Sequence, residues 1–121
     1  MKNIVQIFKA LGDETRLKIL IILSRRRICA KGISKHLDIS EAAVSQHLKV
    51  LKEAGIVKGE KIGYYVHYDL QEEGLSKISD FIYDIKSQNA SEDCIFNISI
   101  PKDCKAVCKM NKNKCCQKYS K

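Results

Sequence analysis

The chain lacks three features that would place it among membrane, secreted or catalytic proteins. It has no run of 18 apolar residues, so no transmembrane helix is expected. Its first 14 residues, MKNIVQIFKALGDE, contain neither a long apolar stretch nor a small-residue cleavage site, so no secretory signal is expected. It also has no Ser/His/Asp order, no glycine-rich phosphate loop and no paired carboxylates in an apolar setting. We therefore expect a cytoplasmic protein that is not an enzyme and has no membrane partner.

The composition favours one small folded domain with a polyanionic partner. The chain has 121 residues, 45% of them hydrophobic, which excludes disorder throughout. Its formal net charge is +8. Residues 1–70 and 101–121 are basic, whereas residues 71–100 are acidic. The two basic blocks suit binding to phosphate groups. A chain of this size often gains stability by pairing with a second chain.

Residues 31–57 predict two short helices joined by a tight turn. In the second helix, Ser40 suits the N-cap and Gly55 a left-handed stop. One face carries apolar residues at i, i+4 and i+7: Val44, Leu48 and Leu51. The opposite face carries donors and cations that suit base edges and phosphates: Ser45, Gln46, Lys49 and Lys52. We interpret the pair as a DNA-reading helix-turn-helix; the alternative is an ordinary amphipathic pair with a solvated lysine face.

Residues 56–70 predict a β-hairpin directly after this helix pair. Strand-forming residues flank Gly63, which places the tip near residues 61–63. Lys58 and Lys61 are expected on or near that tip. A basic hairpin beside a helix-turn-helix is a wing that touches DNA backbone or minor groove.

Helices are also predicted on both sides of this unit. Residues 3–11 and 14–24 have helical patterns, with Asp13 as the cap of the second. Residues 71–88 carry an apolar stripe formed by Leu75, Ile78, Ile82 and Ile85, with Phe81 alongside. Such a stripe needs a partner. The domain's own core is one candidate, but we favour the same helix of a second chain, with the N-terminal helix packed beside it.

The composition changes after Gln88, which divides the chain into residues 1–88 and a C-terminal segment, residues 89–121. That segment is rich in lysine and in cysteine: Cys94, Cys104, Cys108, Cys115 and Cys116. Nearby lysines favour the thiolate form, which binds metal. Soft thiolates select As(III), Sb(III), Cd(II), Pb(II), Zn(II) or Cu(I). Cys94 is the weaker ligand candidate because it lies ten residues before the others.

Three phrases resemble the ArsR/SmtB family of small dimeric metal-responsive repressors: FKALGDETRLKIL (8–20), ISEAAVSQHLKVLKEAGIV (39–57) and GYYVHYDL (63–70). The resemblance covers residues 4–88. It implies a mainly α winged helix-turn-helix fold with a small β-hairpin, dimerised through its N- and C-terminal helices. It further implies a transcriptional repressor that binds double-stranded DNA at an inverted-repeat operator. An inducer then releases the repressor from that operator. Ser45, Gln46 and Lys49 fall at base-reading positions, and His47 either reaches phosphate or packs inward.

The family's known effector sites are incomplete in this chain. The arsenic-sensing branch has C-x-C where this sequence reads RICAKGI (27–33), so that Cys29 matches and Lys31 replaces the second thiol. The zinc-sensing branch uses histidines on the last helix, and residues 71–88 contain none. We therefore expect a soft metal or metalloid at Cys104, Cys108, Cys115 and Cys116. Cys29 is more often a buried small hydrophobe, although it could join them.

Two alternatives to this effector hypothesis stay open. The thiols could sense an oxidant in a repressor of the same fold. They could instead hold a structural zinc ion in a metal-buffering protein whose helical body only supplies a dimer.

Overall fold

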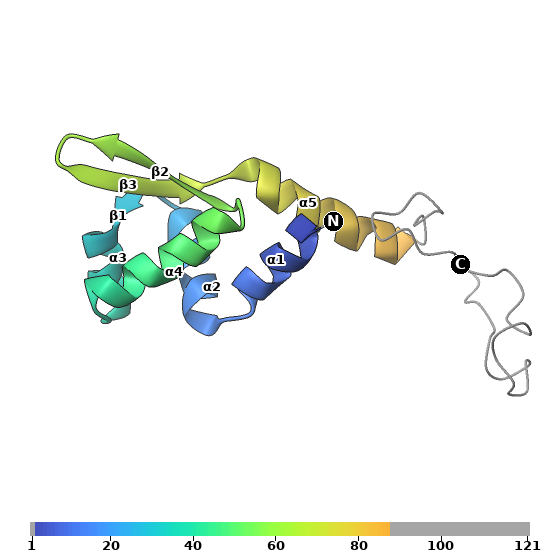
Figure 1. Cartoon of the computed structure of the whole chain (residues 1–121), viewed down its shortest axis with the longest axis horizontal. Helices are drawn as coiled ribbons and strands as arrows, with labels where there is room; N and C mark the ends of the chain where they lie inside the picture. Colours follow the sequence, from blue (N-terminus) through green and yellow to red (C-terminus); the bar gives the residue numbers. More distant parts are fainter. Residues whose placement is uncertain (1, 88–121) are drawn as a thin grey trace, which may run out of the picture. The chain divides into compact units, whose positions relative to one another are not determined.

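The computed structural model describes residues 2–87, which form helices α1 to α5 and one antiparallel sheet (Figure 1). The elements are α1 (Lys2–Leu11), α2 (Glu14–Leu23), β1 (Ile28–Cys29), α3 (Ala30–Leu37), α4 (Glu41–Glu53), β2 (Val57–Ile62), β3 (Tyr65–Leu70) and α5 (Glu72–Ser87). This is the predicted winged helix-turn-helix order. No helix in this part of the chain is long and apolar enough to span a bilayer.

Local side-chain caps start two of the helices where the sequence predicts. The carboxylate of Asp13 accepts the N–H of Arg16 at 3.0 Å, and the hydroxyl of Ser40 accepts the N–H of Ala43 at 3.1 Å. Each bond satisfies a donor that the first turn of a helix leaves unpaired. After α4, Gly55 adopts φ +81°, a left-handed conformation that ends the helix at low cost. The boundaries of α2 and α4 therefore follow from local chemistry.

The turn of the helix-turn-helix is tightened by a serine. Asp38 follows α3 with φ 56°, in the left-handed region that aspartate tolerates better than most residues. The hydroxyl of Ser34 donates to the carbonyl of Ile39 at 2.8 Å, and the N–H of Ile39 donates to the carbonyl of Ser34 at 3.3 Å. These bonds hold the start of α4 against the end of α3.

The wing is a three-stranded sheet in the order β1-β3-β2. The hairpin turns after Ile62, where Gly63 has φ +66°, so the predicted tip is confirmed. The strand β1 was not predicted. It pairs Ile28 with Tyr68 and Cys29 with His67. Two residues are too few to show the alternation by which a strand is recognised.

The core lies between the helices and the base of the wing, and α4 contributes its predicted apolar face to it. The largest fully buried side chains are Ile7, Ile19, Ile33, Leu48, Leu51, Ile56, Val44 and Val57. In α2 the buried residues are Ile19 and Leu23, whereas Leu17 and Ile21 are 45% and 59% exposed. The helix α2 therefore directs only part of its apolar surface to the core of its own chain.

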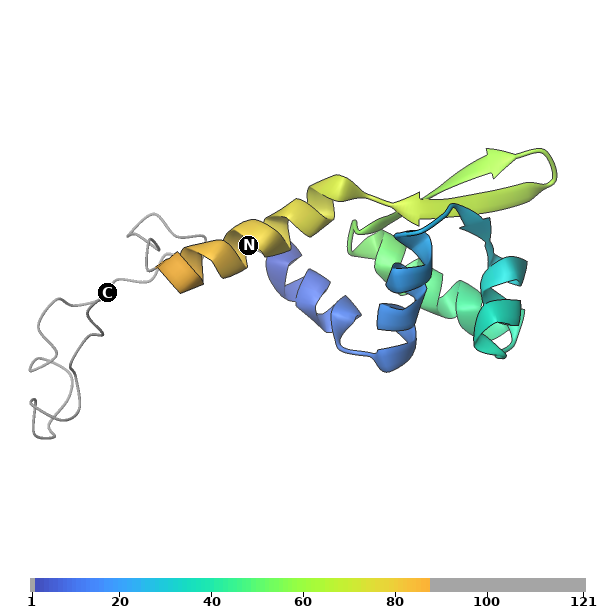
Figure 2. The same cartoon turned by 180° about the vertical axis from the view of Figure 1, so that it is seen from behind.

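The helix α5 begins against the end of α4 and continues beside α1 (Figures 1 and 2). Gly74 is buried there, and a Cβ atom at this position would clash with the carbonyl oxygen of Gly55 and lie 2.8 Å from the Ile56 side chain. The rings of Phe8 and Phe81 meet edge to face, with centroids 5.8 Å apart. The predicted packing of the N-terminal helix beside the last helix is therefore present within one chain.

Candidate nucleic-acid interface

The helix α4 has one buried face and one polar exposed face. Val44, Leu48 and Leu51 are almost completely buried and anchor the helix on the core. The predicted DNA-facing residues are all exposed: Ser45, Gln46, Lys49 and Lys52. Burial of the first face fixes the rotation of the helix, which leaves donors and cations pointing outward.

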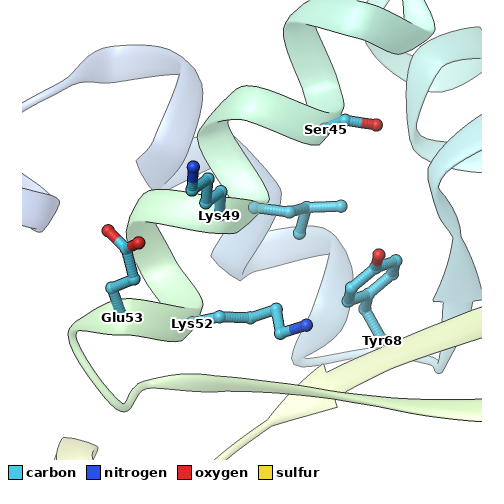
Figure 3. Close-up of a pocket in the computed structure, with 6 residues that line it drawn as sticks. Ser45, Lys49, Lys52, Glu53 and Tyr68 are labelled. Atoms are coloured by element: carbon cyan, nitrogen blue, oxygen red, sulfur yellow. The ribbon is translucent and has the colours of Figure 1, made fainter.

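A groove of about 290 Å³ separates this polar face from the central strand of the wing (Figure 3). It is lined by Ser45, Leu48, Lys49, Lys52, Glu53 and Tyr68. In Figure 3 the ammonium of Lys52 extends toward the ring of Tyr68, whereas the carboxylate of Glu53 lies on the far side of the helix from that ring. Cations and hydroxyls are the groups that bind phosphate oxygens. The groove thus has the chemistry of a phosphate site.

The strand register separates the two predicted wing lysines. Lys61 lies opposite Val66 and Gly59 opposite Tyr68, so these residues share the face that Tyr68 turns toward α4. Lys58 lies opposite Asp69, at the base of the hairpin and on its other face. The expectation that Lys58 lies on or near the tip is therefore wrong. The reason is that β2 runs six residues, through Gly59, before it turns.

Ion pairs cover the face of the wing that carries Lys58. The guanidinium of Arg27 lies 3.3 Å from the Asp69 carboxylate and 3.7 Å from that of Glu60. Arg27 therefore connects the segment after α2 to both strands of the hairpin. All three side chains are more than one-third exposed, so each pair adds little stability but restrains the wing.

The ring of His47 packs inward, the second of the two positions that the sequence left open. Its Nδ1 atom lies 3.3 Å from Nη1 of Arg16 and 4.0 Å from Oδ2 of Asp13. The N–H of Arg16 stabilises the carboxylate of Asp13 and lowers its pKa, and the charge of Arg16 lowers it further. His47 thus belongs to a polar cluster between α2 and α4.

The thiol of Cys29 lies at the end of β1, partly buried, and the residue occupies the N-cap position of α3 without a side-chain cap bond. Across the strand, the Nδ1 atom of His67 is buried with no hydrogen-bond partner. Within residues 2–87, no group of three or more His, Cys, Asp or Glu side chains could hold a metal ion. The remaining predicted ligands lie outside the described residues: Cys94, Cys104, Cys108, Cys115 and Cys116.

Two residues of this surface were not selected from the sequence. Tyr68 carried only the signal of a strand former, and its position facing α4 depends on the register of the hairpin. Arg16 had no local signal, because its contact with His47 spans 31 residues of sequence.

Comparisons with known proteins agree with this architecture. The model of the bacterial regulatory protein, arsR family, matches residues 13–58. The HTH-type transcriptional regulator YbzH of Bacillus subtilis is 32% identical over 93 residues, which cover 64% of this chain and 93% of YbzH. The chain belongs to the ArsR family. This ArsR-family chain is accordingly a DNA-binding transcription regulator and not an enzyme.

Two further relatives of this ArsR-family chain bear on effector and fold. The arsenical resistance operon repressor of Escherichia coli is 42% identical over 67 residues, which cover 54% of this chain and 57% of that repressor. An ArsR-like transcriptional regulator from Rhodococcus superimposes with a TM-score of 0.66 at 30% identity, covering 72% of this chain and 82% of that one. The winged helix-turn-helix fold is thus shared with a solved relative.

Proposed function

We propose that two copies of this chain form a repressor that binds an inverted-repeat operator and releases it when a soft metal or metalloid ion binds the C-terminal cysteines. The observation that carries the DNA-binding part is the exposed polar face of α4 beside a cationic groove, with Lys61 of the wing on the same side. That arrangement suits a recognition helix in the major groove with the backbone of one strand beside it.

Ser45 and Gln46 are the proposed base-reading side chains, because they are exposed in the first half of α4. Lys49 is proposed to contact a base or the adjoining phosphate. Lys52 and Lys61 are proposed to hold phosphates on either side of the groove. His47 and Lys58 are weaker candidates, since the first packs against Arg16 and the second lies on the far face of the wing.

The proposed dimer face is formed by α1 and α5. These neighbouring helices expose several large apolar side chains in a single chain: Val5, Phe8, Ile82, Tyr83 and Ile85. Tyr83 and Ile85 are 64% and 57% exposed, and they lie on the helix that packs against α1. An apolar patch of this kind marks an interaction site, and a second copy covers it with like surface. Two-fold symmetry then requires two operator half-sites related by inversion.

The proposed effector ligands are the thiolates of Cys104, Cys108, Cys115 and Cys116. Residues 2–87 offer no cluster of ligands, and Lys31 stands where the arsenic-sensing branch has its second cysteine. The name of the Escherichia coli relative supports an arsenical among the candidate effectors, although the chain spans only 57% of that repressor. Three thiolates suit pyramidal As(III), and four suit tetrahedral Zn(II) or Cd(II). A metal weakens DNA binding only through different affinities for the two states of the dimer.

The test begins with selection of duplexes from a random-sequence pool by the full reduced protein. The enriched duplex and a scrambled version are then titrated in the presence of As(III), Cd(II), Zn(II), Cu(I) or peroxide. We expect an inverted repeat to be enriched. We also expect at least one of the metal ions to lower the affinity of the protein for this duplex tenfold or more. Release by peroxide alone would favour the oxidant sensor, and metal binding without any selected duplex would favour the metal-buffering protein.

Thiol variants of the full chain locate the effector site. Replacement of Cys104, Cys108, Cys115 and Cys116 together by Ser is expected to preserve DNA binding and abolish release. Cys94→Ser is the matched control within the same segment, and Cys29→Ser tests the thiol of β1. Release that survives the fourfold variant but not Cys29→Ser would contradict the proposed site.

A further inference from the structure

The side chain of Arg16 joins three elements of the fold. Its Nε donates to the carbonyl of Ala10 at 2.6 Å, and Nη2 reaches the carbonyl of Lys9 at 3.5 Å. Both carbonyls belong to the last turn of α1, whose acceptors have no partner within the helix. The remaining nitrogen, Nη1, lies 3.3 Å from Nδ1 of His47 in the middle of α4. One guanidinium on α2 therefore connects the end of α1 to the recognition helix.

This contact selects the tautomer of His47 that can accept from Arg16. A guanidinium carries only donors and stays charged, so Nδ1 must act as the acceptor. This hydrogen bond uses the tautomer of His47 that carries its proton on Nε2. Asp13 faces the same group: its carboxylate accepts the N–H of Arg16 at 3.0 Å and lies 4.0 Å from Nδ1 of His47. The aspartate thereby balances the charge of Arg16 beside the ring of His47.

A second polar contact joins α1 to α4 near the end of α4. The amide of Gln6 donates to the carbonyl of Glu53 at 3.2 Å. His47 and Glu53 are six residues apart, which is about 9 Å along a helix. Two attachment points at this separation set the direction of α4 relative to α1. The recognition residues on either side of His47 move with it.

We propose that Arg16 is a positioning residue for DNA reading, which acts through His47 to hold the recognition helix at a set angle to α1. The inference rests on the proposed DNA-binding function and adds the route by which α1 controls it. The helix α1 also carries Phe8, whose ring meets Phe81 of α5. A shift of the α1–α5 pair therefore reaches α4 through the Arg16–His47 contact.

The test compares variants of the full chain on the wild-type-selected duplex and on its scrambled version. Arg16→Gln and His47→Ala are each expected to lower the specific-to-nonspecific binding ratio about tenfold, the scale of one hydrogen bond to a charged group. The double variant should lose no more than either single variant, because both act in one contact. The salt dependence should not change, since neither side chain holds a phosphate. Lys18→Gln is the matched control, a cation of α2 that pairs with Glu14 within the helix.

Two measurements separate positioning from a general loss of structure. His47→Asn keeps an acceptor oxygen near the place of Nδ1 and should retain the binding ratio within about threefold of wild type. Nitrogen-15 NMR should show His47 with its proton on Nε2 in the wild type, and a mixture of tautomers in Arg16→Gln. Thermal unfolding identifies any variant that fails to fold. If Arg16→Gln does not fold, the comparison of His47→Ala with His47→Asn still tests the positioning role.

Three results would overturn the positioning role. One is a salt slope that falls by about one unit in Arg16→Gln, which would place this guanidinium on a phosphate. Another is a double variant whose loss equals the product of the single losses. The third is a wild-type chain that selects a duplex while Arg16→Gln and His47→Ala bind it unchanged. A wild-type chain that selects no duplex refutes the proposed function itself, which is a distinguishable outcome.

Discussion

The two lysines of β2 allow the orientation of the wing to be tested with a matched pair. Lys58 and Lys61 are three residues apart, but their cross-strand partners, Asp69 and Val66, place them on opposite faces. Only the face of Lys61 carries Tyr68, which lines the groove beside α4. Lys61→Gln should therefore remove a phosphate contact from each protomer, whereas Lys58→Gln should remove none.

The size of the effect follows from counterion release. Each phosphate contact contributes about 0.9 to the slope of log K against log salt concentration. A dimer that loses one contact per protomer should show a slope smaller by about 1.8. When the salt concentration falls from 1 M to 0.1 M, one phosphate contact raises the binding constant K about eightfold, and two contacts raise it about sixtyfold. Lys58→Gln should leave the slope unchanged, because Lys58 lies on the face of the hairpin opposite to that of Tyr68.

Fluorescence anisotropy with the selected duplex, at several salt concentrations, measures these slopes. The scrambled duplex should show the same difference between the variants, since phosphate contacts carry no sequence information. Thermal unfolding of both variants serves as the control for folding. An equal fall in slope for the two lysines, or a larger fall for Lys58→Gln, would show that the wing does not meet DNA with its Tyr68 face.

Three further predictions concern the stability of the fold. Ser40→Ala should lower the free energy of unfolding by about 1 kcal/mol in urea titrations, because it removes the cap of α4; an unchanged midpoint would contradict this. Gly74→Ala should destabilise the chain far more than Gly12→Ala, since a Cβ at Gly74 meets the backbone of Gly55, while one at Gly12 meets atoms no closer than 3.6 Å; equal melting temperatures would refute the close packing. The lowered pKa of Asp13 predicts a stabilising effect that is present above the ordinary value of 3.8 and is lost as the pH falls through the lower folded value. The stability difference between wild type and Asp13→Asn should therefore shrink in acid, and a difference that grows there would have the wrong sign.

The sequence predicted those parts of the fold that depend on neighbours along the chain. Ser40 and Asp13 cap the helices that follow them because their side chains reach N–H groups three residues away. Gly63 turns the hairpin because glycine accepts positive φ at low cost. The recognition helix was also predicted with its faces assigned, because the spacing of Val44, Leu48 and Leu51 allows one buried face.

The features that sequence reading missed depend on partners far along the chain. Which apolar residues of α2 are buried is decided by the elements packed on that helix, so Ile19 is buried and Ile21 is exposed although both are isoleucine. The strand β1 exists because β3 offers it an edge, and the paired residues Ile28 and Tyr68 are 40 positions apart in the sequence. The register of the hairpin decides that Lys61, and not Lys58, lies on the face that carries Tyr68. The composition of the segment does not reveal this register.

The close approach of Gly74 to Gly55 has a consequence for protein engineering. Because the first turn of α5 rests on the residue that ends α4, and the N–H of Gln71 donates to the carbonyl of Ile56 at 2.9 Å, the two helices share a rigid joint. A chimera that exchanges residues 71–88 for the last helix of another regulator must therefore keep a glycine at position 74. A larger residue at position 74 would change the angle between the exchanged helix and the recognition helix α4.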